Sequence, residues 1–561
     1  MISTRLLAVA ACVLMWCIPQ QAEAQSLADQ ALSKARSGQV EEALRLYQQA
    51  LAQTPDNVAI LRDYAVVLGS AGKYADALPV VRKTFALEAT QPEWALREFA
   101  GIYLFGDAVP DALATLDLLI RGGDQSEQTL NRRGLALRWL GRSEDSVEAY
   151  RFLLTVHPNS EAGTIGLAFA FADQEKFASA LELLKSESPQ IKKARIRILN
   201  WSGRHFEAQR LLDQLPAELA EDREVLEDRV AASRWGGDPS SAVKYMDRLS
   251  VLHPDNDTVK LSHELNVELG HSVATSYRFS RDSFGLTEQI AAADFIVHAS
   301  AAHAIRFGYQ YRTFDQEGDI SRTLVRYDLG WSGILNKRFA AYASIATVDY
   351  RQPGLSRKLS GDGSISFAAN DRLRFNSGGG RIVMDAYPAL RDQVTAPFGF
   401  GEISYRFFAR TDLQIRYSRY SFSDQVNRDR ADLQFKTRVL SKRILKLDLG
   451  SRLMGLWHDR QTSDFWSPTR FYSTLGVAQA EGRLSSWLDI LGEIAAGFQS
   501  EHGSQTQHPM QFSGRIAAHP GYHWRGILEL GKSTSSVDRA LPGQNTYSRW
   551  FLGATAEYHF H

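Results

Sequence analysis

The sequence predicts an α + β protein of two domains, an N-terminal α-helical solenoid followed by a C-terminal antiparallel β-barrel of about 16 strands. In the first half, glycine, alanine and proline return at a fixed offset about every 34 residues. After His271, apolar and polar residues alternate along segments of about ten residues. A repeat of this length is typical of a helical solenoid, and a period of two is typical of strands with one wet and one dry face.

The first 24 residues have the pattern of a secretory signal peptide. Arg5 precedes an apolar run over residues 6–18, and Ala22-Glu23-Ala24 fits the small-residue pattern that signal peptidase cuts. A membrane anchor would need about 18 or more apolar residues, and this run is shorter. No later segment offers 18 consecutive apolar residues either. We therefore expect a signal peptide over residues 1–24, and any crossing of a membrane has to be made by strands.

Charge and cysteine content exclude several classes of protein. Lysine and arginine balance aspartate and glutamate over the whole chain, so there is no overall basic footprint for nucleic acid. The halves differ, with a net charge of −8 over residues 25–272 and +8 over residues 273–561. Cys12 and Cys17 are the only cysteines, and both lie in the expected signal peptide. A mature chain without thiols can hold neither a disulfide nor a thiolate metal site.

The repeat in the first half is specific. Gly38, Ala43, Tyr47, Ala50 and Pro55 stand at the spacings of a tetratricopeptide repeat. Further copies follow at Gly72 with Ala77, at Gly106, at Gly141 through Pro158 and at Gly237 through Pro254, with weaker ones at 177–184 and 203–212. We expect about seven repeats over residues 25–270, the last closed by a helix over 257–269. Such a solenoid offers a concave surface that binds protein or an extended ligand.

The second half, residues 271–561, is expected to form the transmembrane β-barrel. Strand-like segments recur near residues 272, 289, 303, 322, 339, 358, 372, 397, 412, 431, 443, 470, 486, 510, 522 and 548. An even number of strands suits closure, and about 18 residues per strand with its connection suits a membrane barrel. The connections near 384–396, 455–469, 499–509 and 533–547 are long enough to act as lids.

A soluble sandwich or propeller also alternates along its strands, and two features count against it. Aromatic residues crowd the ends of segments, as interfacial girdles would: Tyr309 and Tyr311, Tyr417 and Tyr420, Phe471 and Tyr472, and Trp550. The polar face is dense in arginine, which suits a water-filled lumen better than a packed core. The last strand alternates from Trp550 to Phe560, like the C-terminal signal of outer-membrane barrels, although His561 follows the final aromatic residue.

Together these features resemble the exopolysaccharide export porins, of the poly-N-acetylglucosamine porin and cellulose synthase operon C types. The segment Phe465-Trp466-Ser467-Pro468 through Tyr472 is similar to a motif that opens a strand in those barrels. Its candidate residues are Phe465, Trp466, Pro468 and Tyr472, and a turn proline with interfacial aromatics explains them equally well. The resemblance implies an outer-membrane channel that passes a biofilm exopolysaccharide, with its repeats in the periplasm.

Candidate polymer contacts follow from the alternation, which places Arg306, Arg312, Arg326, Arg416 and Lys446 in the lumen. A basic lumen would favour an anionic polymer. Alternatively these cations neutralise acidic groups on neighbouring strands, and we favour this second interpretation because Asp328, Asp432 and Asp448 also point inward. The charge and identity of the polymer stay open.

No enzyme, cofactor or metal site is expected. Gly378-Gly379-Gly380 lacks the strand-to-helix context that cradles phosphate, and His298 with His303 lacks zinc spacing. The expected partners are an exopolysaccharide, periplasmic proteins bound by the repeats, and outer-membrane lipid, with a monomer and no nucleic acid. Two other functions stay open, a surface receptor or adhesin with a plugged barrel and a scaffold that the barrel anchors.

Overall fold

The computed structural model describes residues 22–408, 410–442, 444–535 and 547–560. The chain divides into two compact units, one up to Glu187 and one from Ser188 onward. The second unit therefore joins the last helices to the barrel. Most of the expected signal peptide lies outside the described residues, and residues 22–24 begin the first described helix.

The first unit is built from antiparallel pairs of helices. Residues 22–36 share a buried core with α2, and each later odd-numbered helix pairs with the next even-numbered one. Their buried faces share alanine, leucine and a few large aromatic residues. The helices are α2 (Val40–Gln53), α3 (Val58–Ser70), α4 (Tyr74–Leu87), α5 (Glu93–Phe105), α6 (Val109–Arg121), α7 (Glu127–Trp139), α8 (Ser143–Val156), α9 (Glu161–Asp173) and α10 (Phe177–Leu183).

The second unit begins with more helices of the same kind. They are α11 (Pro189–Trp201), α12 (His205–Leu212), α13 (Arg223–Trp235), α14 (Pro239–Leu252) and α15 (Asn256–Leu269), with a short 3-10 turn at Ala217–Leu219. α10 has 7 residues and α12 has 8, whereas α8 and α14 have 14. These two shortened second helices explain why the repeat pattern is weak over 177–212.

The turn glycines of the repeats have the backbone conformation that the pattern requires. Gly38, Gly72, Gly141 and Gly237 have φ between +72° and +81°, a region that L side chains rarely adopt. The third repeat differs from the expectation, because Gly106 has an ordinary φ and Asp107 takes the left-handed position at 64°. Aspartate tolerates this region better than most residues do, so the turn survives without a glycine.

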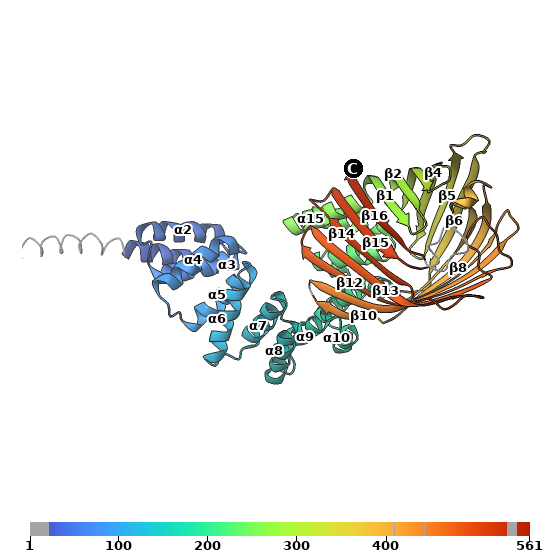
Figure 1. Cartoon of the computed structure of the whole chain (residues 1–561). Coiled ribbons are helices and arrows are strands. Elements are labelled where there is room, and N and C mark those ends of the chain that lie inside the picture. Colours follow the sequence, from blue (N-terminus) through green and yellow to red (C-terminus); the bar gives the residue numbers. More distant parts are fainter. Residues whose placement is uncertain (1–21, 409, 443, 536–546, 561) are drawn as a thin grey trace, which may run out of the picture. The chain divides into compact units, whose positions relative to one another are not determined.

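Sixteen antiparallel strands close into one barrel in the part of the chain that the structure describes (Figure 1). They are β1 (His271–Asp282), β2 (Leu286–Ser300), β3 (His303–Gln316), β4 (Arg322–Asn336), β5 (Phe339–Tyr350), β6 (Lys358–Ala368), β7 (Leu373–Val383), β8 (Thr395–Phe408), β9 (Thr411–Ser421), β10 (Asn427–Lys442), β11 (Leu445–His458), β12 (Arg470–Ser485), β13 (Leu488–Glu501), β14 (Met510–Ala518), β15 (Trp524–Ser533) and β16 (Arg549–Phe560). The strand number and the fold class predicted from the sequence are confirmed.

Each strand pairs with its neighbours in sequence, and β1 closes the ring by pairing with β16. Because α15 leads directly into β1, the start of β1 lies at the end of the barrel that we call the helix-side end. The connections that follow even-numbered strands lie at this end and are short, as in the two residues between β2 and β3. The connections that follow odd-numbered strands lie at the far end and include the long ones.

The outer face of the barrel is apolar. Phe307, Leu329, Ile345, Ile403 and Leu528 are each 44–58% exposed although they are large and hydrophobic. A continuous apolar outer face is what a barrel presents to lipid chains. Among the described residues, no helix is both long and apolar enough to span a membrane.

The expected aromatic girdle is correct at some positions and wrong at two. Tyr309, Tyr417 and Trp550 are exposed on the outer face. Tyr420 and Phe471 instead lie on the inner face, and Phe471 is fully buried. Adjacent residues of a strand, such as Phe471 and Tyr472, point to opposite faces, and so do residues three apart, such as Tyr417 and Tyr420. One member of each pair therefore had to point inward.

Candidate functional site

The inner face of the barrel carries the charged residues. Strand register places Arg306 on β3 and Arg326 on β4 beside two acidic residues of neighbouring strands. Arg306 contacts Asp294 at 2.6 Å and Asp328 at 3.4 Å, and Arg326 lies 3.6 Å from Asp328. Two guanidinium groups thus share two carboxylates across β2, β3 and β4.

The other candidate arginines have carboxylate partners as well. Arg312 pairs with Glu288 and, at 2.6 Å, with Asp385. Arg416 contacts Glu402 at 3.4 Å, and its guanidinium lies over the ring of Phe400, 4.1 Å from its centroid. These pairs support our interpretation that the inward cations neutralise acidic groups of the wall.

Lys446 lies on the same inward set as Asp448, opposite Glu481 in strand register. Asp448 itself accepts contacts from Arg438 at 2.8 Å and from Lys436 at 3.3 Å. All five residues that the sequence nominated are therefore on the inner face. Contact with a polymer at any of them stays a prediction.

Hollows open between these side chains. One, of about 500 Å³, is lined by residues that include Glu402, Arg416, Arg430 and Arg452. Another, of about 370 Å³, lies over Asp294, Arg306, Arg326 and Asp328. The inner face thus combines hydrogen-bonding groups with space for water or a polar chain.

The connection from β7 to β8, residues 384–394, folds inward at the far end. Leu390 is 1% exposed and packs with Tyr387 against Phe314 and Tyr350, which point inward from the wall. Ala389, Val394 and Phe465 belong to a second buried cluster with Phe422 on the other side. We call residues 384–394 the inward segment.

Polar contacts fix the inward segment at both sides. The Tyr387 hydroxyl donates to the backbone carbonyl of Ile320 at 2.7 Å, and Arg322 donates to the carbonyl of Tyr387 at 3.0 Å. Gln393 donates to the carbonyl of Ser356 at 2.5 Å. The sequence showed only that this connection is long enough for a lid. Its apolar residues were the one available signal that it packs inside.

The strand-opening motif divides between two environments. Phe465 and Trp466 are buried, where Phe465 packs against Phe422 and Trp466 against Phe471. Pro468 is buried as well, and its carbonyl lies 2.8 Å from Nδ1 of His458. Tyr472 is 50% exposed on the outer face. Phe465 and Trp466 thus form part of the packing at the far end and are not interfacial aromatics, because the connection brings them back over the inner wall.

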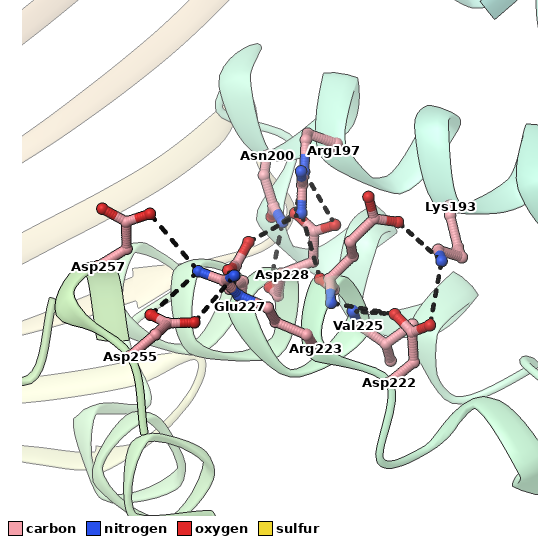
Figure 2. Close-up of polar contacts among 11 residues, drawn as sticks. Lys193, Arg197, Asn200, Asp222, Arg223, Val225, Glu227, Asp228, Asp255 and Asp257 are labelled. Atoms are coloured by element: carbon pink, nitrogen blue, oxygen red, sulfur yellow. Dashed lines mark hydrogen bonds and ion pairs between the residues drawn. The ribbon is translucent and has the colours of Figure 1, made fainter. Parts of the chain in front are cut away.

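The helices of the second unit carry a network of ion pairs, shown in Figure 2. It joins α11, α13 and the start of α15, three successive first helices of the repeats. Lys193 contacts Asp222 at 3.2 Å and Glu224 at 2.7 Å. Arg223 reaches Glu227 at 2.9 Å within α13 and Asp255 at 2.9 Å before α15.

Asp228 is the buried centre of this network. Arg197 contacts its carboxylate at 3.3 Å, and the side chain of Asn200 donates to it at 3.2 Å (Figure 2). Burial raises the pKa of Asp228 to about 6, and the attraction to Arg197 offsets only part of this effect. Six carboxylates face three cations in this network, which therefore has a surplus of acidic groups.

The helices contact the helix-side end of the barrel within the second unit. The carboxylate of Asp371, in the turn between β6 and β7, accepts the backbone N–H groups of Phe206 at 2.8 Å and Glu207 at 3.3 Å. A barrel turn thereby caps the first turn of α12. On α15, the ring of His263 lies edge-on to Tyr522, with centroids 4.5 Å apart. Nothing in the sequence indicated these contacts.

Within the described ranges, no three His, Cys, Asp or Glu side chains gather in a way that would hold a metal ion.

Comparison with known proteins identifies the repeats directly. A family model for the tetratricopeptide repeat matches residues 34–95. No curated protein matches the chain. Among solved structures, one described as a bacterial polysaccharide outer membrane secretin has 13% identity and a TM-score of 0.45, covering 52% of this chain and 98% of that one.

Two further solved structures resemble parts of the chain. A tetratricopeptide repeat protein from Parabacteroides merdae ATCC 43184 has 14% identity and a TM-score of 0.39, over 43% of this chain and 98% of that one. A MamA protein has 18% identity and a TM-score of 0.27, over 33% and 94%. The architecture of this chain, tetratricopeptide repeats joined to a closed barrel of sixteen described strands, is the one that export porins of the repeat-and-barrel type are expected to have.

Proposed function

We propose that this protein is an outer-membrane channel that exports an exopolysaccharide, with its repeats in the periplasm. The observation that carries the proposal is the two-faced closed barrel, apolar outside and lined with paired charges and polar hollows inside. A barrel of about 16 strands is wide enough to keep an aqueous lumen. Sugar hydroxyls need hydrogen-bonding groups along their path, and the paired side chains of the wall offer them.

The channel acts as a passive conduit in this proposal and performs no chemistry on the polymer. Polymer synthesis at the inner membrane supplies the driving force, because the outer membrane offers no nucleotide. The repeats recruit periplasmic proteins or guide the chain, and the acidic surplus around Asp228 favours a basic protein partner. We propose a monomer, since one chain closes the whole barrel.

Single-channel conductance of the purified full-length protein in a planar bilayer tests this function. We expect channels of steady conductance that added oligosaccharides block. Anionic, neutral and cationic oligosaccharides are compared in turn, so that the class that blocks also reports the charge of the substrate. A protein that inserts but neither conducts nor responds to any oligosaccharide, even after residues 384–394 are loosened by substitution, would exclude an export channel.

A second function is favoured by one observation, the inward segment, which packs against the inner wall at the far end. A permanently plugged barrel would serve as a receptor or as an anchor for a scaffold. The same recordings separate the two functions, provided that the inward segment is also loosened by substitution. A channel that stays silent after loosening favours the receptor or scaffold.

A further inference from the structure

The helix-side end of the barrel contains a cavity of about 580 Å³. The turns of the repeats at 203–206 and 235–237 line one side of it. The turns at 336–340 and 370–374 and the adjoining ends of β8 and β9 line the other side. All of these residues belong to the second compact unit. We call this space the mouth cavity.

Cations dominate the mouth cavity. Its lining holds Lys337, Arg338, Arg372, Arg374 and Arg406 against two carboxylates. Both carboxylates are already engaged, since Asp371 caps α12 and Asp412 pairs with Arg406 at 2.9 Å. Among the described residues, no ion pair joins Lys337, Arg338, Arg372 or Arg374 to an acidic side chain, and all four are exposed.

This arrangement differs from the lumen wall. There, Arg306, Arg312 and Arg416 each have a carboxylate within 3.4 Å. Neutralisation of acidic wall residues explains the arginines of the lumen. It does not explain a cluster of cations at the mouth that has no acidic partners. A cluster of like charges costs free energy through repulsion, and an anionic ligand relieves that cost.

The cavity also contains exposed aromatic surface. Trp235 is 55% exposed and lines the cavity together with Phe206. The C–H faces of a sugar ring pack against the negatively polarised face of an aromatic ring. Guanidinium groups bind carboxylate or sulfate in a bidentate manner. Rings beside unpaired guanidinium groups therefore match a sugar that carries an acidic group.

The position of the arginines favours a polymer over a lipid headgroup. Arg374 stands opposite Ser404, on the same inward set as Glu402, and Arg406 stands opposite Asp412 on that set. Arg374 and Arg406 thus lie at the start of the inward-facing residues of the wall, which continue to Arg416. A lipid phosphate would be met by cations of the outer face.

We propose that the mouth cavity binds the acidic groups of an anionic polysaccharide as the chain enters the barrel. This inference rests on the proposed export function and adds the charge class of the substrate. The acidic network on α11, α13 and α15 is a separate surface, which such a polymer would avoid.

The test measures binding of oligogalacturonate to the full-length protein in detergent, by calorimetry and by Trp fluorescence. The variant R372Q/R374Q removes two of the cations, and R351Q/R357Q at the far end is the matched control. We expect R372Q/R374Q to weaken binding about tenfold or more, because charge-assisted hydrogen bonds are lost. The control should bind oligogalacturonate like the unmodified protein. Added salt should weaken binding to the control and to the unmodified protein alike.

Three outcomes would overturn the inference. Oligogalacturonate fails to bind, it binds R372Q/R374Q as tightly as the unmodified protein, or a chitosan oligosaccharide binds more tightly. If R372Q/R374Q loses affinity only for vesicles that contain phosphatidylglycerol, the mouth cavity is a lipid site instead. Conductance is recorded in parallel. A conducting channel that only neutral or cationic sugars block keeps the export function and rejects the acidic substrate, whereas a channel that stays silent after the inward segment is loosened rejects the export function itself.

Discussion

At the residue scale, close packing explains why particular small and large residues recur in the repeats. Tyr150 on α8 is 2% exposed and lies between Gly134 on α7 and Gly166 on α9. A Cβ atom at Gly134 would lie 2.6 Å from the Tyr150 ring, and one at Gly166 would lie 2.1 Å from it. The tyrosine therefore requires glycine on both neighbouring helices. The sequence pattern identified Tyr150, but not the two glycines that accommodate it.

The ionisation of Asp228 gives a prediction about pH. Its pKa is about 6 in the folded protein against an ordinary value of 3.8, so folding favours the protonated form. This contribution is fully present below pH 3.8 and is lost as the pH rises through 6. A shift of this size corresponds to about 3 kcal/mol in the free energy of unfolding. The variant D228N should remove this pH dependence between pH 4 and 7.

Helical circular dichroism of the full-length protein during urea unfolding measures the effect. The control E227Q changes a partly exposed carboxylate one position away and should keep the pH dependence. Equal slopes of stability against pH in the unmodified protein and D228N would contradict the prediction.

At the element scale, the inward segment is held by burial of a few apolar side chains. Leu390 is 1% exposed between the inner wall and the rest of the segment, whereas the next residue, Arg391, has a side chain that is 67% exposed. Placing a charge at Leu390 removes apolar contacts and buries an unpaired carboxylate, at a cost of several kcal/mol. We expect L390D to release the segment.

Bilayer recordings test this release. L390D should increase conductance or open probability at least twofold, because the far end is no longer packed. R391D places the same carboxylate at an exposed position, where it removes only a surface ion pair with Asp392, and it should behave like the unmodified protein. If L390D and R391D both dissolve normally in detergent micelles and give the same conductance, the inward segment does not control the pore.

The helices and strands themselves were predictable to a large extent. The starts of all sixteen described strands fall within four residues of the expected positions, because alternation over about ten residues is a strong signal. The repeats were equally clear wherever glycine, alanine and proline kept their offset. The path of the β7–β8 connection was not predictable, because it depends on apolar side chains from strands far away in the sequence, such as Phe314 and Tyr350.

At the scale of the whole molecule, the chain divides within the repeats at Glu187 and not where the strands begin. Asp371 caps α12, and His263 packs on Tyr522, so the last helices belong with the barrel. A chain that keeps residues 1–24 and then continues from Ser188 should therefore insert as a folded, heat-modifiable barrel with unchanged conductance.

A matched deletion that continues from His271 also removes α11–α15 and provides the comparison. It should lose oligogalacturonate binding at the mouth cavity, because Phe206 and Trp235 are gone, and its barrel should be less resistant to heat. Electrophoretic mobility before and after heating measures folding in both chains. Failure of the chain from Ser188 to fold would show that the first unit is needed for the barrel.

The sequence by itself determined the two architectures, the order in which they follow and the alternation of strand residues between two faces. These features depend on local periodicity, which the spacing of apolar, small and turn residues sets directly. Tertiary structure alone decided which charges are paired, which loop packs inside the far end and which cations stay without acidic partners at the mouth. Such contacts join residues up to hundreds of positions apart, as between Arg278 and Glu529, and only closure of the barrel brings these residues together.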